Sequence, residues 1–355
     1  MSIEKLLKYE PFDHAKVKKF SVIKNTVKLL TFHHFKFCKE YKKIIVNLKI
    51  DITKIKKVEN FPMLPVRLFK KFELKSVKNK NVVKQLVSSG TSGKELSKIY
   101  LDKKNAKNQV KVLSRIMTYL IGNKRLPMLI IDQDPKLPKN NFFNARSAAI
   151  YGFSIFGKNH CFLLDRNGKI DYQTLNNFLK EFGGEKFLIF GFTSYVYDNL
   201  IKKISLKLVN SSLKNGLLLH GGGWKKLENI KISNKKFKNN LNKKFKLKKV
   251  YNYYGLVEQT GSIFIESEKC GYFHTSIFSD IFIRDINFNI LKNKKRGLIQ
   301  LISLLPKSYP GHNILTEDMG EIVGEDDCKC GLKGKYFLVH GRAKEAEIRG
   351  CSDVE

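Results

Sequence analysis

The sequence of 355 residues is short of arginine and of acidic side chains. Arginine contributes only nine of the 67 basic residues, and Asp and Glu together number 32, so lysine carries most of the formal charge of +35. Arginine is the side chain that best matches phosphates and base edges, and the lysines are spread over the whole chain. We therefore expect no specific nucleic-acid binding, while weak association with acidic surfaces stays open.

Long apolar runs are missing as well. No stretch approaches the roughly 18 uncharged apolar residues of a membrane-spanning helix, and residues 1–18 carry charges throughout instead of the apolar core of a secretory signal. Without an export signal, the six cysteines are expected to be free thiols in a cytoplasmic protein. The 26 Phe and 14 Tyr residues supply enough apolar area for a folded core.

The order of apolar runs predicts an α/β protein. Runs such as Pro127–Ile131 and Lys186–Phe190 alternate with helical patterns such as Lys103–Leu120, which indicates β-α units and a mostly parallel sheet. The lysine-rich run 235–249 reads as a solvated segment. The predicted divisions are a basic helical segment (1–60), an α/β nucleotide- and acyl-binding region (61–270), an antiparallel β-rich region (271–340) and a tail (341–355).

A segment rich in glycine and hydroxyl groups follows the strand predicted for 82–88. Glycine lets backbone N–H groups approach a phosphate closely, hydroxyls add donors, and Lys94 adds charge. The spacing excludes a Walker loop, which needs four residues between its glycines and a Ser or Thr after the lysine. Alone, the segment fits either a phosphate loop or an ordinary turn. It reads Ser88-Ser89-Gly90-Thr91-Ser92-Gly93-Lys94.

This segment and three later ones resemble, in order, the motifs of the acyl-adenylate-forming superfamily. Residues 253–258 (Tyr-Tyr-Gly-Leu-Val-Glu) resemble its Tyr-Gly-x-x-Glu segment. Residues 315–320 (Leu-Thr-Glu-Asp-Met-Gly) resemble its Thr-Gly-Asp-x-Gly segment, and residues 340–345 (His-Gly-Arg-Ala-Lys-Glu) its Gly-Arg hinge. The resemblance implies the adenylate-forming enzyme fold, with N-terminal β-α lobes and a small β-rich region, and ATP with Mg²⁺ as cofactors.

The resemblance also implies a role for each matching residue. Ser88 to Gly93 would hold the phosphates of ATP together with Lys94, and Glu258 would bind Mg²⁺. Tyr254 and Gly255 would lie beside adenine, and Asp318 and Arg342 near the ribose. The segment Gly221-Gly222-Gly223 resembles the lining of the adenine pocket. The structural alternatives are a solvated carboxylate for Glu258, a core side chain for Tyr254 and a turn residue for Asp318.

The sequence departs from full-length ligases of the superfamily after the hinge. Those enzymes continue with a lobe of about one hundred residues that bears a catalytic lysine, whereas only 13 residues follow Arg342 here. With that lobe truncated, the usual route to a coenzyme A thioester is in doubt. The chain length, the His-Gly-Gly-Gly-Trp-Lys segment at 220–225 and a cysteine near the end resemble the acyl-protein synthetase (LuxE) family.

That second resemblance implies a long-chain-fatty-acid–protein ligase. The family adenylates a fatty acid, moves the acyl group to its own cysteine and passes it to a fatty acid reductase partner. Cys351 matches the acceptor by position, and a spare thiol is its structural alternative. Two other readings stay open: a relative of acyl-CoA or aryl-CoA ligases completed by another polypeptide, and a non-catalytic basic scaffold with a decayed nucleotide site.

Four further residues could bind a metal ion. Cys328 and Cys330 form one close pair, and Cys270 with His274 forms another. Together they offer the Cys/His ligands that suit tetrahedral zinc, although their spacing is not that of a standard finger. Reduced cysteines in a turn are the favoured reading, and zinc is the alternative.

Overall fold

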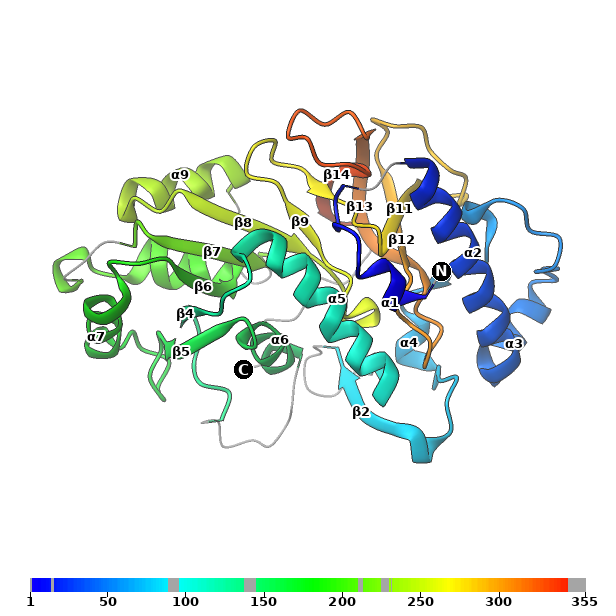
Figure 1. The fold of residues 1–355 in the computed structure, drawn as a ribbon, viewed down its shortest axis with the longest axis horizontal. Helices are drawn as coiled ribbons and strands as arrows, with labels where there is room; N and C mark the ends of the chain where they lie inside the picture. Colours follow the sequence, from blue (N-terminus) through cyan, green and yellow to red (C-terminus); the bar gives the residue numbers. More distant parts are fainter. Residues whose placement is uncertain are drawn as a thin grey trace. The chain divides into compact units, whose positions relative to one another are not determined.

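The fold is given by a computed structural model, which describes residues 2–13, 16–88, 96–136, 145–209, 213–224, 230 and 232–343 (Figure 1). These residues divide into two compact units. Unit 1 comprises the described residues up to 119 together with those from 255 onward, and unit 2 comprises those between 120 and 254.

Unit 2 is built on a parallel sheet with the strand order β5-β4-β6-β7-β8. Every residue of β6 and of β7 is buried, as expected for parallel strands that are covered on both faces. The parallel pairing predicted from the apolar runs is therefore confirmed. The strands are β4 (Leu126–Ile130), β5 (Gly157–Phe162), β6 (Phe187–Phe192), β7 (Gly216–Gly221) and β8 (Lys249–Tyr254).

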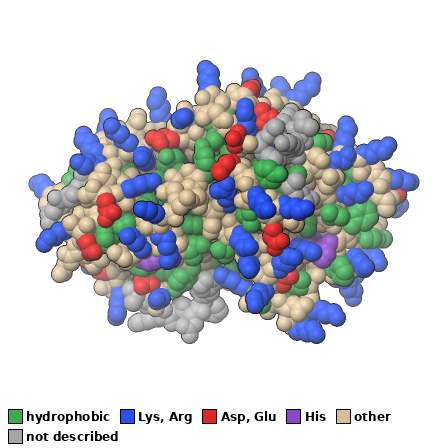
Figure 2. Space-filling view, viewed as in Figure 1, with side chains coloured by type: hydrophobic (Ala, Val, Ile, Leu, Met, Phe, Trp, Pro, Cys, Tyr) green, Lys and Arg blue, Asp and Glu red, His purple; other side chains and the backbone are tan. Residues whose placement is uncertain are grey.

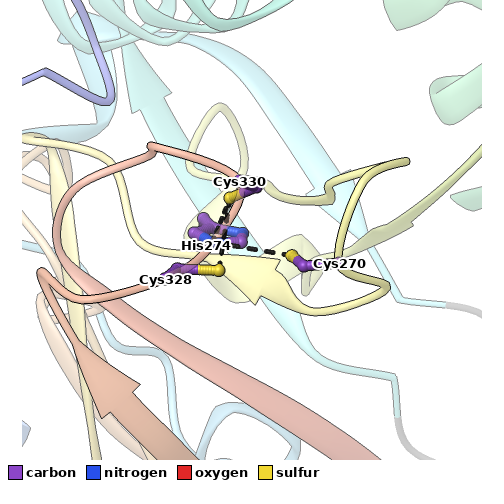
Figure 3. A group of neighbouring side chains, drawn as sticks. All are labelled: Cys270, His274, Cys328 and Cys330. Atoms are coloured by element: carbon purple, nitrogen blue, oxygen red, sulfur yellow. Dashed lines mark hydrogen bonds between the residues drawn. The ribbon is translucent and has the colours of Figure 1, made fainter.

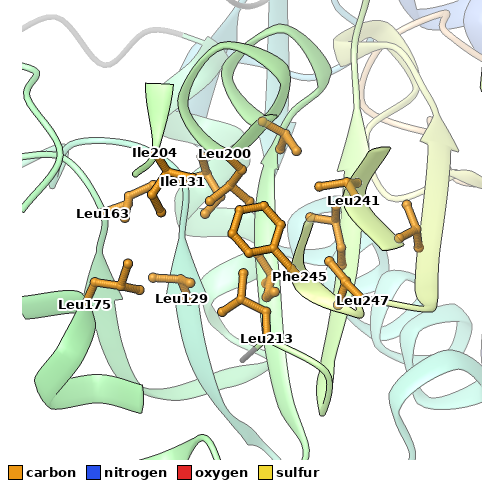
Figure 4. Packing of buried hydrophobic residues seen from close by; sticks show 14 of the residues in the cluster. Leu129, Ile131, Leu163, Leu175, Leu200, Ile204, Leu213, Leu241, Phe245 and Leu247 are labelled. Carbon is orange, nitrogen blue, oxygen red and sulfur yellow. The ribbon is translucent and has the colours of Figure 1, made fainter. Parts of the chain in front are cut away.

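Helices of unit 2 alternate with these strands and pack apolar side chains against the sheet. Leu175, Leu200, Leu241 and Phe245 come from three successive helical segments and meet in one buried cluster (Figure 4). The helical segments are α6 (Ala145–Ser154), α7 (Tyr172–Phe182), α8 (Thr193–Tyr195), the π-helix η3 (Val196–Lys203), the 3₁₀ turn η4 (Leu206–Leu208) and α9 (Asn234–Phe245).

The reading of residues 235–249 as a solvated segment is wrong. Helix α9 occupies most of this run, and its Phe237, Leu241 and Phe245 are buried at a spacing of four residues. That spacing places the three side chains on one helical face, where they can reach the sheet. The lysines occupy the remaining positions and dominate the composition, which concealed the apolar stripe. The side chain of Ser233 caps the helix by accepting from the N–H of Lys236 at 3.2 Å.

Unit 1 contains an antiparallel sheet with the order β9-β10-β14-β13-β12-β11. The antiparallel pairs predicted in the β-rich region are thus confirmed. Strand β1 (Leu64–Pro65) pairs in parallel with β13, and β2 (Val82–Val87) forms a separate hairpin with β3 (Lys98–Asp102). The sheet strands are β9 (Phe264–Glu266), β10 (Phe273–His274), β11 (Ser279–Arg284), β12 (Gly297–Ser303), β13 (Asn313–Glu325) and β14 (Lys335–Arg342).

The N-terminal part of unit 1 is helical, as predicted. Its helices are α1 (Ile3–Leu6), α2 (Lys16–Phe37), α3 (Lys39–Asn47) and α4 (Leu68–Lys71), followed along the chain by α5 (Lys103–Ile121). Short 3₁₀ turns also occur, namely η1 (Val58–Asn60), η2 (Asn79–Asn81) and η6 (Val257–Gln259). None of the described helices is both long enough and apolar enough to cross a membrane. On the face seen in Figure 2, lysines and arginines are dispersed among acidic and neutral groups.

Two buried histidines attach α2 to the rest of unit 1. His34 Nε2 lies 3.1 Å from the carbonyl of Pro306 and its Nδ1 lies 2.7 Å from Ser76 Oγ, while the ring of His312 stacks on it with centroids 4.9 Å apart. A carbonyl only accepts, so Nε2 carries the proton and Nδ1 accepts from the serine. Thr31 Oγ1 bonds His312 Nε2 at 3.0 Å. Burial lowers the pKa of His312 to about 3 and the pKa of His34 well below its usual value.

Truncating Leu241 to alanine tests the apolar face of α9. Its side chain is fully buried, so we expect the free energy of unfolding to fall by about 2–5 kcal/mol. Denaturant unfolding monitored by circular dichroism measures this loss. Lys243→Ala, on the exposed side of the same helix, should stay within about 0.5 kcal/mol of the wild type. Equal stability of both variants would favour the solvated reading.

The histidine stack predicts acid sensitivity. Both imidazoles stay neutral in the folded protein, whereas the unfolded chain binds protons near about pH 6.5. Stability is therefore complete above that pH and falls below it, by up to about 1.4 kcal/mol per pH unit for each imidazole. Replacing His312 by glutamine removes one such group, so the variant should lose stability less steeply in urea unfolding between about pH 6 and 5. Identical slopes would contradict the neutral, buried state of His312.

Candidate active site

The glycine-rich segment connects the two strands of the β2–β3 hairpin. The N–H of Ser88 donates to the carbonyl of Ser97 at 3.0 Å, and the N–H of Ser97 donates to Ser88 Oγ at 2.9 Å. This reciprocal pair closes the hairpin at its end. Strand β3 was not predicted from the sequence. Ser88 is the only member of the predicted phosphate loop among the described residues; Ser89, Gly90, Thr91, Ser92, Gly93 and Lys94 lie outside them.

Glu258 lies in the same unit, with Ser97 among its neighbours. It is only 4% exposed, and burial raises the pKa of its carboxyl group above the usual value. The side chain of Ser97 and the positive charges of Lys70 and Arg342 act in the opposite direction. The expectation of a solvated loop carboxylate, which was the structural alternative for Glu258, is therefore wrong. A buried carboxyl group with a shifted pKa is a candidate for contact with a ligand or a hard cation.

Buried hydrogen bonds fix the turn that carries Glu258. Nε2 of Gln259 donates to the carbonyls of Leu301 at 3.1 Å and Gly311 at 2.9 Å. Gly311 also packs so closely that a Cβ there would lie 2.5 Å from the carbonyl oxygen of Glu258. Any larger residue at 311 would displace the turn. The position of Glu258 is thus set by strands of the antiparallel sheet that are distant in sequence.

Asp318 and Arg342 lie opposite each other on β13 and β14. Their Cα atoms are register partners, and Arg342 Nε is 4.0 Å from Asp318 Oδ1. The N–H of Asp318 donates to Thr316 Oγ1 at 3.1 Å, and that hydroxyl donates to the carbonyl of Ile299 at 2.8 Å. The strands shift register next to this pair, between Met319 and Gly320. The carboxylate and the guanidinium are therefore held side by side at a bulge, and both are partly accessible.

In unit 2, the three consecutive glycines begin at Gly221, the last residue of β7. A Cβ on Gly221 would lie 2.4 Å from the ring of Tyr253, and Gly222 adopts a positive φ of 78°. Both positions therefore require glycine for reasons internal to the protein. Gly223 differs, because no described atom lies within 4 Å of the position that its Cβ would take. Packing of the described residues therefore gives no reason for glycine at 223.

Tyr254 is the last residue of β8 and is half-buried. Side chains alternate along a strand, so Tyr254 and Tyr253 point to opposite faces. The sequence analysis singled out Tyr254, but Tyr253 is the residue whose ring packs on Gly221 and lies 4.9 Å from the ring of Phe153. The next residue, Gly255, belongs to unit 1, where a Cβ would come within 3.2 Å of Ile263.

The residues that flank the glycines belong to the core. His220 is buried, its Nδ1 bonds Thr193 Oγ1 at 2.9 Å, and burial lowers its pKa to about 3. Trp224 packs edge-on against Tyr197, with ring centroids 4.9 Å apart. These contacts show that both side chains take part in the packing of unit 2.

A charged cluster that the sequence analysis missed lies at the carboxyl end of β4. Asp132 is buried, and the guanidinium of Arg146 contacts both its carboxylate oxygens and the hydroxyl of Tyr195, with a distance of 2.7 Å from Nε to Oδ2. In the parallel sheet, β5 pairs with one edge of β4, and the next strand along the chain, β6, pairs with the other edge. The topological switch point therefore lies between β4 and β6. Open parallel sheets bind ligands at that point. An aspartate directly after an apolar strand was the available signal.

The remaining sequence-predicted residues fall into two groups. Cys351, the predicted acyl acceptor, lies outside the described residues. The candidate zinc ligands are brought together in unit 1, where the ligand atoms of Cys270, His274, Cys328 and Cys330 lie within 4.8 Å of one another.

Comparison with known proteins supports this description. The sequence model that describes the acyl-protein synthetase (LuxE) family matches residues 2–355 of this chain. The chain is similar to 2-hydroxyisobutyryl-CoA ligase in an open conformation with 2-HIB-AMP and CoA, with a TM-score of 0.71 and 13% identity over 94% of this chain and 77% of that chain. It is also similar to the same ligase in the postadenylation state, with a TM-score of 0.69 and 12% identity over 93% of this chain and 69% of that chain. A third similar structure is that of the amide bond synthetase McbA from Marinactinospora thermotolerans, with a TM-score of 0.50 and 12% identity over 74% of this chain and 49% of that chain. No curated protein matches. At these identities the structural similarity shows the fold, and it confirms the predicted adenylate-forming ligase fold.

Proposed function

The chain belongs to the acyl-protein synthetase (LuxE) family, and from this premise we propose that it activates a long-chain fatty acid with ATP and transfers the acyl group to its own Cys351. The observation that carries the proposal is the extent of the family match, which covers residues 2–355 and so includes the tail with Cys351. The adenylate-forming ligase fold supports the first half of this reaction.

The proposed chemistry has two steps. A carboxylate is a poor electrophile, so its oxygen first attacks the α-phosphorus of ATP and pyrophosphate leaves, giving a mixed anhydride with AMP. The thiolate of Cys351 then attacks the acyl carbon, AMP leaves, and a thioester forms. A reductase partner would consume this thioester. We assign the acceptor to the chain itself because the match to the acyl-protein synthetase family includes the segment that contains Cys351.

Residues of unit 1 fit the polar parts of a nucleotide. The carboxylate of Asp318 can accept from two ribose hydroxyls, and Arg342 beside it carries the positive charge that suits a phosphate. Glu258 fits a Mg²⁺ site because its buried carboxyl group offers the oxygen ligands that a hard cation takes. When bound, the cation offsets the charge of the triphosphate. Lys94 and the loop from Ser88 to Gly93 would contribute backbone and side-chain donors to the phosphates.

Asp318→Ala tests the nucleotide assignment. Loss of charge-assisted hydrogen bonds worth about 1.5–3 kcal/mol should reduce fatty-acid-dependent ATP–pyrophosphate exchange about ten- to a hundredfold. Asp13→Ala removes an exposed carboxylate of the same unit and should leave exchange unchanged. Thermal melting of both variants verifies that they are folded. Full exchange in a folded Asp318→Ala variant would show that the ribose assignment is wrong.

Cys351→Ala tests the acceptor. With a labelled fatty acid and ATP, the wild type should retain a label that hydroxylamine releases, as a thioester does. The variant should retain none, while its ATP–pyrophosphate exchange continues because the first step does not use the thiol. Cys161→Ser, which changes a buried cysteine, should still be labelled. Persistent labelling of Cys351→Ala would refute the acceptor role, and free acyl-CoA after addition of coenzyme A would favour the acyl-CoA ligase alternative.

A further inference from the structure

Four metal-ligand side chains converge in unit 1, and none of them is a residue assigned above to the nucleotide or the acyl group. Cys270 precedes β10 and His274 ends it, while Cys328 and Cys330 lie in the turn between β13 and β14. Figure 3 shows the four side chains pointing toward one another from these two segments. The two pairs are more than fifty positions apart in sequence, so the fold itself brings them together.

The spacing of the ligand atoms suits a tetrahedral ion. Zinc bonds of about 2.3 Å to sulfur and about 2.0–2.1 Å to nitrogen place ligand atoms about 3.5–3.8 Å apart. Cys330 Sγ lies 3.3 Å from Cys328 Sγ and 3.3 Å from His274 Nε2, and Cys270 Sγ lies 4.0 Å from the same nitrogen. The three cysteines are free thiols. These separations bracket the tetrahedral values.

The imidazole is oriented for metal binding by a second hydrogen bond. His274 Nδ1 lies 3.0 Å from the carbonyl oxygen of Tyr272. Because a carbonyl only accepts, Nδ1 carries the proton, and the unprotonated Nε2 presents its lone pair to the sulfur atoms. Histidines that ligate metals are held in the same way, by a partner on the other ring nitrogen.

In both segments a glycine with a positive φ follows a cysteine of the cluster. Cys270 is followed by Gly271 (φ +75°) and Cys330 by Gly331 (φ +87°), a conformation that favours glycine. In each turn the glycine N–H is bonded to a preceding carbonyl, of Ser267 at 2.8 Å and of Cys328 at 2.9 Å. Each glycine thus lets the chain turn directly after a cysteine of the cluster.

The composition of the cluster selects the metal. Three thiolates and a neutral imidazole fill all four tetrahedral positions with protein atoms, which is the closed arrangement of structural zinc sites. Such a complex carries one negative charge. The buried ammonium group of Lys19 offsets that charge from beside the cluster, where it donates to Thr275 Oγ1 at 2.6 Å.

We propose that Cys270, His274, Cys328 and Cys330 bind one structural zinc ion, which joins the β13–β14 turn to β10. The site would stabilise the antiparallel sheet and takes no part in acyl transfer. The proposal stands independently of the proposed function, because its tests measure metal content and folding rather than activity.

Metal analysis of the full-length chain tests the proposal directly. Protein purified without a polyhistidine tag, without chelator and under reducing conditions should contain about one zinc per chain. Cys328→Ser and Cys330→Ser should each contain less than about a tenth of that amount, because a hydroxyl is a poor zinc ligand. Cys161→Ser, which alters a buried cysteine of unit 2, should keep its zinc. A wild type without zinc, or with a different metal at this stoichiometry, would overturn the proposal.

A second measurement on the wild type guards against variants that fail to fold. After removal of zinc, added Co²⁺ should give the intense d–d and thiolate charge-transfer absorption of a tetrahedral thiolate site, and added Zn²⁺ should abolish it. Zinc should also raise the melting temperature of the zinc-free chain, because an ion that binds only the native state stabilises it. An octahedral cobalt spectrum, or an unchanged melting temperature, would show that the cluster is a set of reduced thiols.

Discussion

The burial of a single carboxyl group is the constraint on which the candidate site of unit 1 depends. A carboxylate placed away from water is costly unless hydrogen bonds or cations compensate for its lost hydration. Three groups lower the pKa of Glu258 and so oppose the effect of burial: Ser97, where the β2–β3 hairpin closes, Lys70 from α4 and Arg342 from β14. Gly311 leaves room for its turn. Segments that are distant in sequence are therefore arranged around the carboxyl group of Glu258. Each of them would need to shift if the turn that carries Glu258 moved.

The class of the fold could be predicted from the sequence because its strongest signals are local. Strand β6 and the leucines at the centre of β7 form short apolar runs, and α5 and α7 are strongly amphipathic, so each can be recognised by itself. Elements that depend on their partners could not be recognised. Strand β3 follows the glycine-rich segment directly and reads as part of it. Strand β13 contains Gly320 and Gly324, and glycines in a sequence usually indicate turns. The reason for Gly320 is instead the close neighbouring strand, because a Cβ there would lie 2.6 Å from the carbonyl oxygen of Leu338.

The candidate site divides in the same way. The order of the motifs could name Glu258, Asp318 and Arg342 as candidates, because these residue types recur at fixed positions in sequence motifs. Contacts across the sheet left no such pattern. The packing of Tyr253 on Gly221 depends on strand register. The pairing of Arg146 with Asp132 and the meeting of two separate cysteine-containing turns depend on how the chain folds back on itself. Sequence spacing could name the four zinc ligands as candidates, but only the fold could bring their ligand atoms together.

The reciprocal hydrogen bonds between Ser88 and Ser97 have an evolutionary consequence. They involve the two backbone N–H groups, one carbonyl and one hydroxyl, and thus engage no side chain from positions 89–95. These two bonds therefore set no requirement on the side chains at the seven intervening positions. Changes of sequence between the two serines can accumulate in evolution without removing either bond.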